Sequence, residues 1–172
     1  MSDLRAFAST SNIVRFSLKN KTTGQGLTGL TISTSGLIIS TIADNEATPT
    51  VYTQAGSTIE TITTLGTFAT PTATKCRFKL VDNTNHPGLY EFQFADARFA
   101  VANAKRLVIS VNDAESTILD ADYEIELVQF NPFDSVRLGL TSLPAAVPGA
   151  ANGVFIAGTN AATTVTTSLT TT

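Results

Sequence analysis

Residues 76–94 read Cys-Arg-Phe-Lys-Leu-Val-Asp-Asn-Thr-Asn-His-Pro-Gly-Leu-Tyr-Glu-Phe-Gln-Phe, and this stretch decides the fold. At both of its ends apolar and polar residues alternate, which is typical of β-strands with one buried face. Between them, residues 82–88 are dense in residue types that favour turns. The stretch therefore predicts a hairpin with these side chains on its inner face: Cys76, Phe78, Leu80, Tyr90, Phe92 and Phe94.

The same alternation extends to the rest of the first three quarters of the chain. It is strong over residues 14–18, 107–111 and 123–127, and weaker over residues 37–42, 50–54 and 59–65. A short helix is expected over residues 96–104, with Asp96 as its N-cap. Many short strands without a long helix predict an all-β fold, an Ig-like antiparallel β-sandwich over residues 12–130, preceded by an N-terminal arm (1–11).

The character of the sequence changes at residue 131. Asn131-Pro132 ends the last predicted strand, because proline cannot donate to a strand ladder. From residue 136 onward Arg137 is the only charged residue, and the apolar residues are too sparse to form a core of their own. A disordered tail is one interpretation. We favour the other, in which residues 131–172 are a linker and an extended assembly segment ordered by neighbouring subunits.

Apolar side chains in this part of the chain are the candidate contacts with a partner, since aromatic residues often anchor interfaces. Phe130 and Phe133 flank Pro132 where the sandwich ends, and simple packing under a loop is the alternative for them. The interface candidates are Phe130, Phe133, Leu138, Leu140, Leu143, Phe155 and Ile156.

The composition excludes several classes of function. The chain is 42% hydrophobic but only 15% charged, and it contains 29 threonines. A surface so poor in charge is expected to lie against neighbours. The net charge of −3 and the scattered basic residues argue against nucleic-acid binding. The lack of a long apolar run argues against membrane insertion, and no signal peptide is recognised. We expect folding in a cytoplasm.

Nucleophilic catalysis is not indicated. His86 is the single histidine, and Pro87 after it places it in a turn, where a solvated side chain is the ordinary interpretation. A hydrolytic triad would need serine and a carboxylate beside it. Cys76 alternates with apolar residues and is expected to be a buried structural cysteine rather than a nucleophile. Being alone, it cannot form a disulfide within the chain.

Two pairs of carboxylates share one predicted strand face: Asp120 with Asp122, and Glu124 with Glu126. A spacing of about 7 Å would suit an inverting glycosidase, but the same alternation is the usual solvent face of an outer strand. Asp82, Asn83 and Asn85 offer oxygens for Ca²⁺ but lack a further carboxylate. We therefore expect a protein that is not an enzyme, with no catalytic, cofactor-binding or metal-binding residues.

Three blocks of the sequence follow a familiar pattern. Residues 83–100, Asn-Thr-Asn-His-Pro-Gly-Leu-Tyr-Glu-Phe-Gln-Phe-Ala-Asp-Ala-Arg-Phe-Ala, with Ala-Lys-Arg-Leu-Val-Ile at 104–109, form the first. Residues 124–134, Glu-Ile-Glu-Leu-Val-Gln-Phe-Asn-Pro-Phe-Asp, form the second, and residues 150–164 the third. Together they cover 50 of the 172 residues. They resemble the N-terminal β-sandwich modules, and the linker after them, of bacteriophage tail-fibre and other virion structural proteins.

The resemblance implies a bacteriophage virion structural protein, assembled in the host bacterial cytoplasm. In that family the linker precedes a stalk, so the last segment is a possible start of a fibre stalk. Fibres of this kind are homotrimers, which implies partners in other copies of the chain and in tail or capsid subunits. A head decoration or head-fibre protein is an alternative, and a host-glycan-binding module ranks below it because tryptophan is absent.

Overall fold

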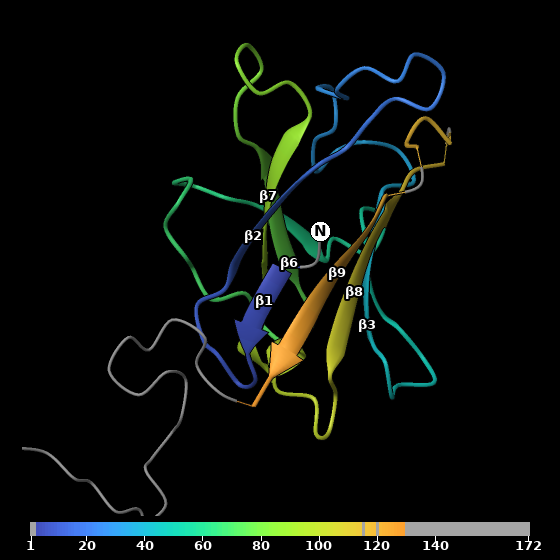
Figure 1. Cartoon of the computed structure of the whole chain (residues 1–172). Coiled ribbons are helices and arrows are strands. Elements are labelled where there is room, and N and C mark those ends of the chain that lie inside the picture. Colours follow the sequence, from blue (N-terminus) through green and yellow to red (C-terminus); the bar gives the residue numbers. More distant parts are fainter. Residues whose placement is uncertain (1–2, 115, 120, 130–172) are drawn as a thin grey trace, which may run out of the picture.

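The computed structural model describes residues 3–114, 116–119 and 121–129. Over these residues the fold is all-β, and two mixed sheets pack against each other as a β-sandwich (Figure 1). The five-stranded sheet has the order β1-β9-β8-β3-β4: Asp3–Ala6, Ala121–Val128, Arg106–Asn112, Ile38–Ala43 and Thr50–Thr53. The four-stranded sheet has the order β2-β7-β6-β5: Ile13–Ser17, Leu89–Phe94, Cys76–Leu80 and Ile59–Thr61.

The predicted hairpin forms the centre of the four-stranded sheet. β6 and β7 are antiparallel, and Phe78 lies opposite Phe92 in their register. Five of the six predicted inner side chains are buried, and Leu80 at the end of β6 is partly buried. Gly88 has a φ of +85°, and a Cβ there would lie 2.6 Å from the carbonyl oxygen of Leu18. The turn therefore requires glycine at this position.

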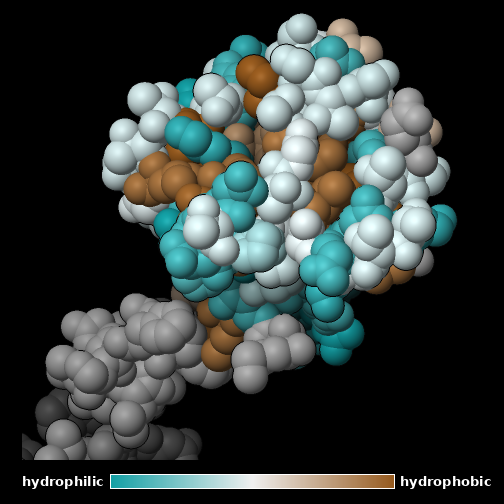
Figure 2. All heavy atoms as spheres, turned by 90° about the horizontal axis from the view of Figure 1, so that it is seen from above, coloured by the Kyte–Doolittle hydropathy of each residue, from teal (hydrophilic) through white to brown (hydrophobic). Residues whose placement is uncertain are grey.

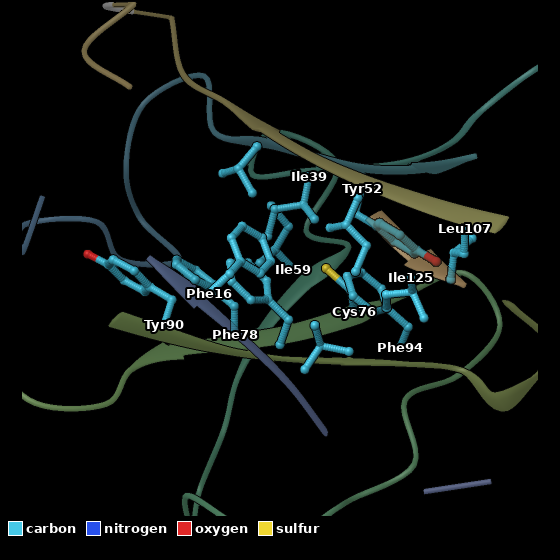
Figure 3. Close-up of a cluster of buried hydrophobic side chains, with 14 of the residues drawn as sticks. Phe16, Ile39, Tyr52, Ile59, Cys76, Phe78, Tyr90, Phe94, Leu107 and Ile125 are labelled. Atoms are coloured by element: carbon cyan, nitrogen blue, oxygen red, sulfur yellow. The ribbon is translucent and has the colours of Figure 1, made fainter. Parts of the chain in front are cut away.

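The core is a set of aromatic and aliphatic side chains between the two sheets (Figure 3). The rings of Phe16 and Phe92 stack with centroids 4.4 Å apart, and Tyr123 stacks on the other side of Phe16 at 4.8 Å. This ladder of rings connects β7 in one sheet to β9 in the other. Burial of such side chains supplies most of the driving force for folding.

The expectation of antiparallel sheets is wrong for two strand pairs. β5 pairs in parallel with β6, and β1 pairs in parallel with β9. Parallel neighbours need a long crossover, and residues 62–75 supply one between β5 and β6. The predicted N-terminal arm (1–11) contains β1, which forms one edge of the five-stranded sheet. The predicted boundary of the sandwich at residue 130 lies outside the described residues.

The expected helix at residues 96–104 is a short 3₁₀ turn, η1, at Asp96–Phe99. Its N-cap residue is Ala95, without a side-chain cap, so the prediction that Asp96 is the N-cap is wrong. The Asp96 carboxylate instead accepts a hydrogen bond of 2.8 Å from the backbone N–H of Ser11. This contact ties the segment between β1 and β2 to the connection that follows β7.

The outer edge of β4 is capped by a side chain at its last residue, Thr53. The Oγ1 atom of Thr58 accepts the backbone N–H of Thr53 at 2.7 Å and donates to its carbonyl oxygen at 3.3 Å. The Thr58 hydroxyl thus takes the place of a neighbouring strand at this residue. Unpaired edge groups are the usual starting point for pairing between sheets.

Phe92 tests the register of the hairpin, because its ring lies against Phe16, Phe78 and Phe94. We expect Phe92→Ala to lower the free energy of unfolding by about 3–5 kcal/mol, measured by chemical denaturation. Val51 is 48% exposed, so Val51→Ala is the matched control and should cost less than about 0.5 kcal/mol. A loss below about 1 kcal/mol for Phe92→Ala would contradict the register.

Candidate functional site

The seven predicted interface residues, Phe130, Phe133, Leu138, Leu140, Leu143, Phe155 and Ile156, all lie outside the described residues. Their predicted contacts therefore stay predictions. The carboxylate of Asp120 also lies outside the described part. The sites that the structure does place are the chemical candidates of the sandwich, a hollow between the sheets, and two buried ionic clusters.

Cys76 is fully buried on the inner face of β6, as predicted. Burial raises the pKa of its thiol, so the thiol stays protonated and is a poor nucleophile. His86 lies in the loop between β6 and β7 with an exposed side chain, and its Nδ1 is 3.8 Å from Oδ2 of Asp82. Cys76 is therefore a core residue, and His86 is an exposed loop residue that lies beside the Asp82 carboxylate.

The Asp82 carboxylate is used by its own loop. It accepts the backbone N–H groups of Thr84 and Asn85, and the side-chain amide of Asn85. These donors hold the pKa of Asp82 at about 2. Since the oxygens face N–H donors, the loop has the geometry of a turn. Among the described residues no group of three or more metal-ligating side chains occurs.

The acidic side chains of β9 are paired across the outer face of the five-stranded sheet. Ser110 on β8 donates its hydroxyl to Asp122, and Arg106 lies with Nε 3.2 Å from Oε1 of Glu124. The side chains of Asp122 and Glu124 are exposed. This arrangement fits the solvent face of an outer strand, where such pairs contribute little to stability.

A hollow of about 300 Å³ lies at the seam between the sheets, where β2 faces the start of β9. Its lining residues are Phe16, Ser17, Lys19, Leu119, Ala121, Asp122 and Tyr123. One end of the hollow lies next to the loops that follow β2 and precede β9. The backbone closes this end, since the Leu119 N–H donates to the carbonyl oxygen of Lys19 at 2.9 Å. Toward the other end β1 pairs with β9 from Ile125 onward.

The floor of this hollow is aromatic and aliphatic. Tyr123 stacks on Phe16 with an interplanar angle of 9°, and partial burial raises the pKa of the Tyr123 hydroxyl, which stays neutral. Leu119 is 42% exposed. Ile32 and Leu119 belong to the loops that gather at one end of the sandwich, where apolar atoms lie in patches among polar ones (Figure 2). The hollow thus combines an apolar floor with polar side chains from Ser17, Lys19 and Asp122.

Sequence reasoning missed this hollow. The available signal was the adjacent pair Ile118 and Leu119 in a turn-rich segment. Two consecutive apolar residues at the start of a strand cannot both point inward. Ile118 is 6% exposed and enters the core, which leaves Leu119 outside.

A second unexpected feature is the burial of Glu91 and Gln93. The alternation of β7 predicts both on a solvent face, yet both are fully buried. The crossover of residues 62–75, which we call the strap, covers this face. Its backbone N–H at Gly66 donates to Glu91 at 3.0 Å, and that at Ala69 donates to Gln93 at 3.1 Å. The prediction failed because alternation does not reveal what lies over a sheet.

The buried polar groups under the strap are satisfied. Arg15 on β2 contacts Glu91 at 2.6 Å, and the Gln93 amide donates both to Glu91 and to the carbonyl oxygen of Thr67. A buried carboxylate is tolerated only with such partners. At the border of the strap, Lys75 and Arg77 both pair with Glu60 and lower its pKa. Polar contacts therefore hold the strap on the sheet.

The second buried ionic cluster joins the segment after β7 to the five-stranded sheet, at the end where β3 runs into β4. Arg98 in η1 is 8% exposed and contacts both carboxylate oxygens of Glu46, at 2.8 and 2.5 Å. The Arg98 Nε atom also donates to the hydroxyl of Thr41 on β3. The Arg98 hydrogen bonds, opposed in part by desolvation, hold the pKa of Glu46 at about 2. This cluster fastens the connection after β7 to the opposite sheet.

Comparisons with known protein families, with curated proteins and with solved structures find no match for this chain. Within the described residues, no helix has the length and apolar character needed to cross a membrane.

Glu91 should be critical for the strap. Glu91→Ala removes the acceptor for Gly66, Gln93 and Arg15, and we expect a loss of about 1–3 kcal/mol in the free energy of unfolding. Amide hydrogen exchange at Gly66 and Ala69 should become faster. The control is Glu124→Ala, which removes an exposed ion pair and should cost less than about 1 kcal/mol. Equal effects of the two variants would contradict the role assigned to Glu91.

The lowered pKa of Glu46 predicts that the stability of the protein depends on pH. Its pKa falls from 4.5 to about 2 on folding, so its contribution to stability is complete above the unfolded pKa and is lost as the pH falls through the folded one. We expect the stability difference between wild type and Glu46→Gln to shrink between about pH 5 and pH 2. Urea denaturation at a series of pH values measures it. A difference that stays constant over that range would rule out this assignment.

Proposed function

We propose that this chain is a structural protein of a bacteriophage virion, and that its sandwich is the particle-anchoring N-terminal module of a tail fibre or tail appendage. The observation that carries the proposal is the contrast between the two parts of the chain. Residues 3–128 contain all nine described strands and a closed core. After them, Arg137 is the only charged residue from residue 136 onward, in a sequence with scattered apolar residues.

The contrast favours assembly for a physical reason. Charge repulsion does not keep residues 138–172 apart from other surfaces, since they carry no charged side chain. Several copies can bury together apolar groups that one copy cannot bury alone. Residues 83–109, 124–134 and 150–164 resemble virion modules, and this resemblance suggests that the assembly is a bacteriophage particle. Fibres of that family are homotrimers, so we expect three copies.

We also infer that the sandwich is Ig-like. If the strands are lettered A to G along the chain, with β4 and β5 as C′ and C″, the sheets contain the orders G-F-C-C′ and B-E-D. These orders are those of the two sheets of a variable-type Ig domain. The arrangement departs from it in two places, since β1 lies beside β9 and β5 beside β6. The absence of the B–F disulfide follows from Cys76 being the single cysteine.

Truncation after Phe133 tests the proposal. The shortened chain keeps all described strands, so we expect a folded monomer that is no longer incorporated into particles. The full chain should form trimers by light scattering and be detected by blotting in purified particles. Separate blots of tails and heads then locate it, and a signal in heads alone would favour the decoration alternative. Trimers and incorporation that survive the truncation would contradict the role of the segment.

A further inference from the structure

We propose that the seam hollow between β2 and β9 receives the side chain of Phe155 from a second copy of this chain. The inference rests on the proposed function, because it names the surface on which the assembly segment would dock. Three features support it: the shape and lining of the hollow, the sequence around Phe155, and the length of chain that joins Phe155 to the sandwich.

The hollow has the size and chemistry for an aromatic side chain. Its volume is about 300 Å³, and Phe16, Ala121 and Tyr123 form an apolar floor. The ring stack continues outward through Phe92, Phe16 and Tyr123, with centroid distances of 4.4 and 4.8 Å. A further ring beside Tyr123 would extend the stack in the geometry that aromatic pairs prefer.

The hollow is preformed, so little would have to be ordered on binding. Backbone pairing fixes both sides of it at the end nearer the loops, through the bridge between Asn20 and Ile118 and the bond from Leu119 to Lys19. The 42% exposed side chain of Leu119 lies among the lining residues. Interfaces place their main anchors in preformed hollows that have an apolar floor and a polar rim.

Charge favours an uncharged occupant. The lining contains one cationic residue, Lys19, and one acidic residue, Asp122. The two opposite charges give the lining no net charge, so an uncharged segment can enter without losing an electrostatic attraction. Phe155 stands between Val154 and Ile156, and no charged residue occurs from residue 138 to residue 172. By contrast, Phe133, another interface candidate, is followed directly by the charged residue Asp134, so its segment is not neutral.

The chain length allows Phe155 to reach another copy. From Val128, the end of β9, to Phe155 there are 27 residues (155 − 128). Extended chain spans about 3.3 Å per residue, or about 90 Å in all. A sandwich of this size has a radius of gyration of about 14 Å. The segment is therefore long enough for Phe155 of one copy to reach the seam of a neighbouring sandwich.

Mixing two variants, each with one introduced cysteine in addition to the buried Cys76, tests the contact between copies. Leu119→Cys and Phe155→Cys, carrying different tags, are mixed as full-length chains and oxidised. We expect a disulfide-linked species containing both tags on a non-reducing gel. The matched control replaces Leu119→Cys by Val51→Cys, since Val51 is exposed to a similar degree on another face. Crosslinking no stronger than this control would overturn the proposal.

The strength of association between copies, measured without crosslinking, is the second test of this proposal. Phe155→Ala and Leu119→Asp should each weaken association by on the order of 30-fold, the loss typical of a removed anchor, measured by sedimentation. Val51→Asp should leave it unchanged. If truncation after Phe133 abolishes assembly while Leu119→Asp does not, the hollow is the wrong receptor and the proposed function stands. A Leu119→Cys/Phe155→Cys double variant that closes only within one chain would equally overturn docking on a second copy.

Discussion

The burial of β7 on both faces is the constraint on which the rest of the structure depends. On one face Tyr90, Phe92 and Phe94 enter the core between the sheets, and on the other Glu91 and Gln93 lie under the strap. A strand in this position cannot shift by one residue, because a slip would exchange the aromatic rings with the carboxylate and the amide. The position of β7 then fixes the register of the two strands that pair with it, β2 and β6. The order of the four-stranded sheet therefore follows from β7.

The two ionic clusters have complementary roles around this strand. Arg15 satisfies Glu91 beneath the strap. Arg98, four residues after the end of β7, reaches Glu46 in the connection from β3 to β4. Each joins segments far apart in the sequence and limits how the sheets and their cover can move. Buried pairs of this kind give little net stability compared with apolar residues, but their geometry selects one arrangement. Neither of these two clusters bridges the seam between β2 and β9.

The sequence predicts those features that depend on local alternation. The inner face of the hairpin, from Cys76 to Phe94, follows from period-two spacing alone, and so do the positions of most other strands. Alternation carries no information on strand direction, so the parallel pairs of β1 and β5 were not predicted. A signal for the strap does exist, since residues 61–74 carry no charge. An uncharged connection of that length is expected to lie against a surface. The seam hollow combines residues from both ends of the described chain, and no local pattern joins them.

The Thr58 hydroxyl changes what the edge of β4 offers to another strand. In an assembly, many copies are held at high local concentration, and an open strand edge would let sheets grow from one molecule into the next. Thr58 occupies the amide and carbonyl of Thr53 that such growth would need. A strand of another molecule could pair with β4 at Thr53 only after these two hydrogen bonds are broken.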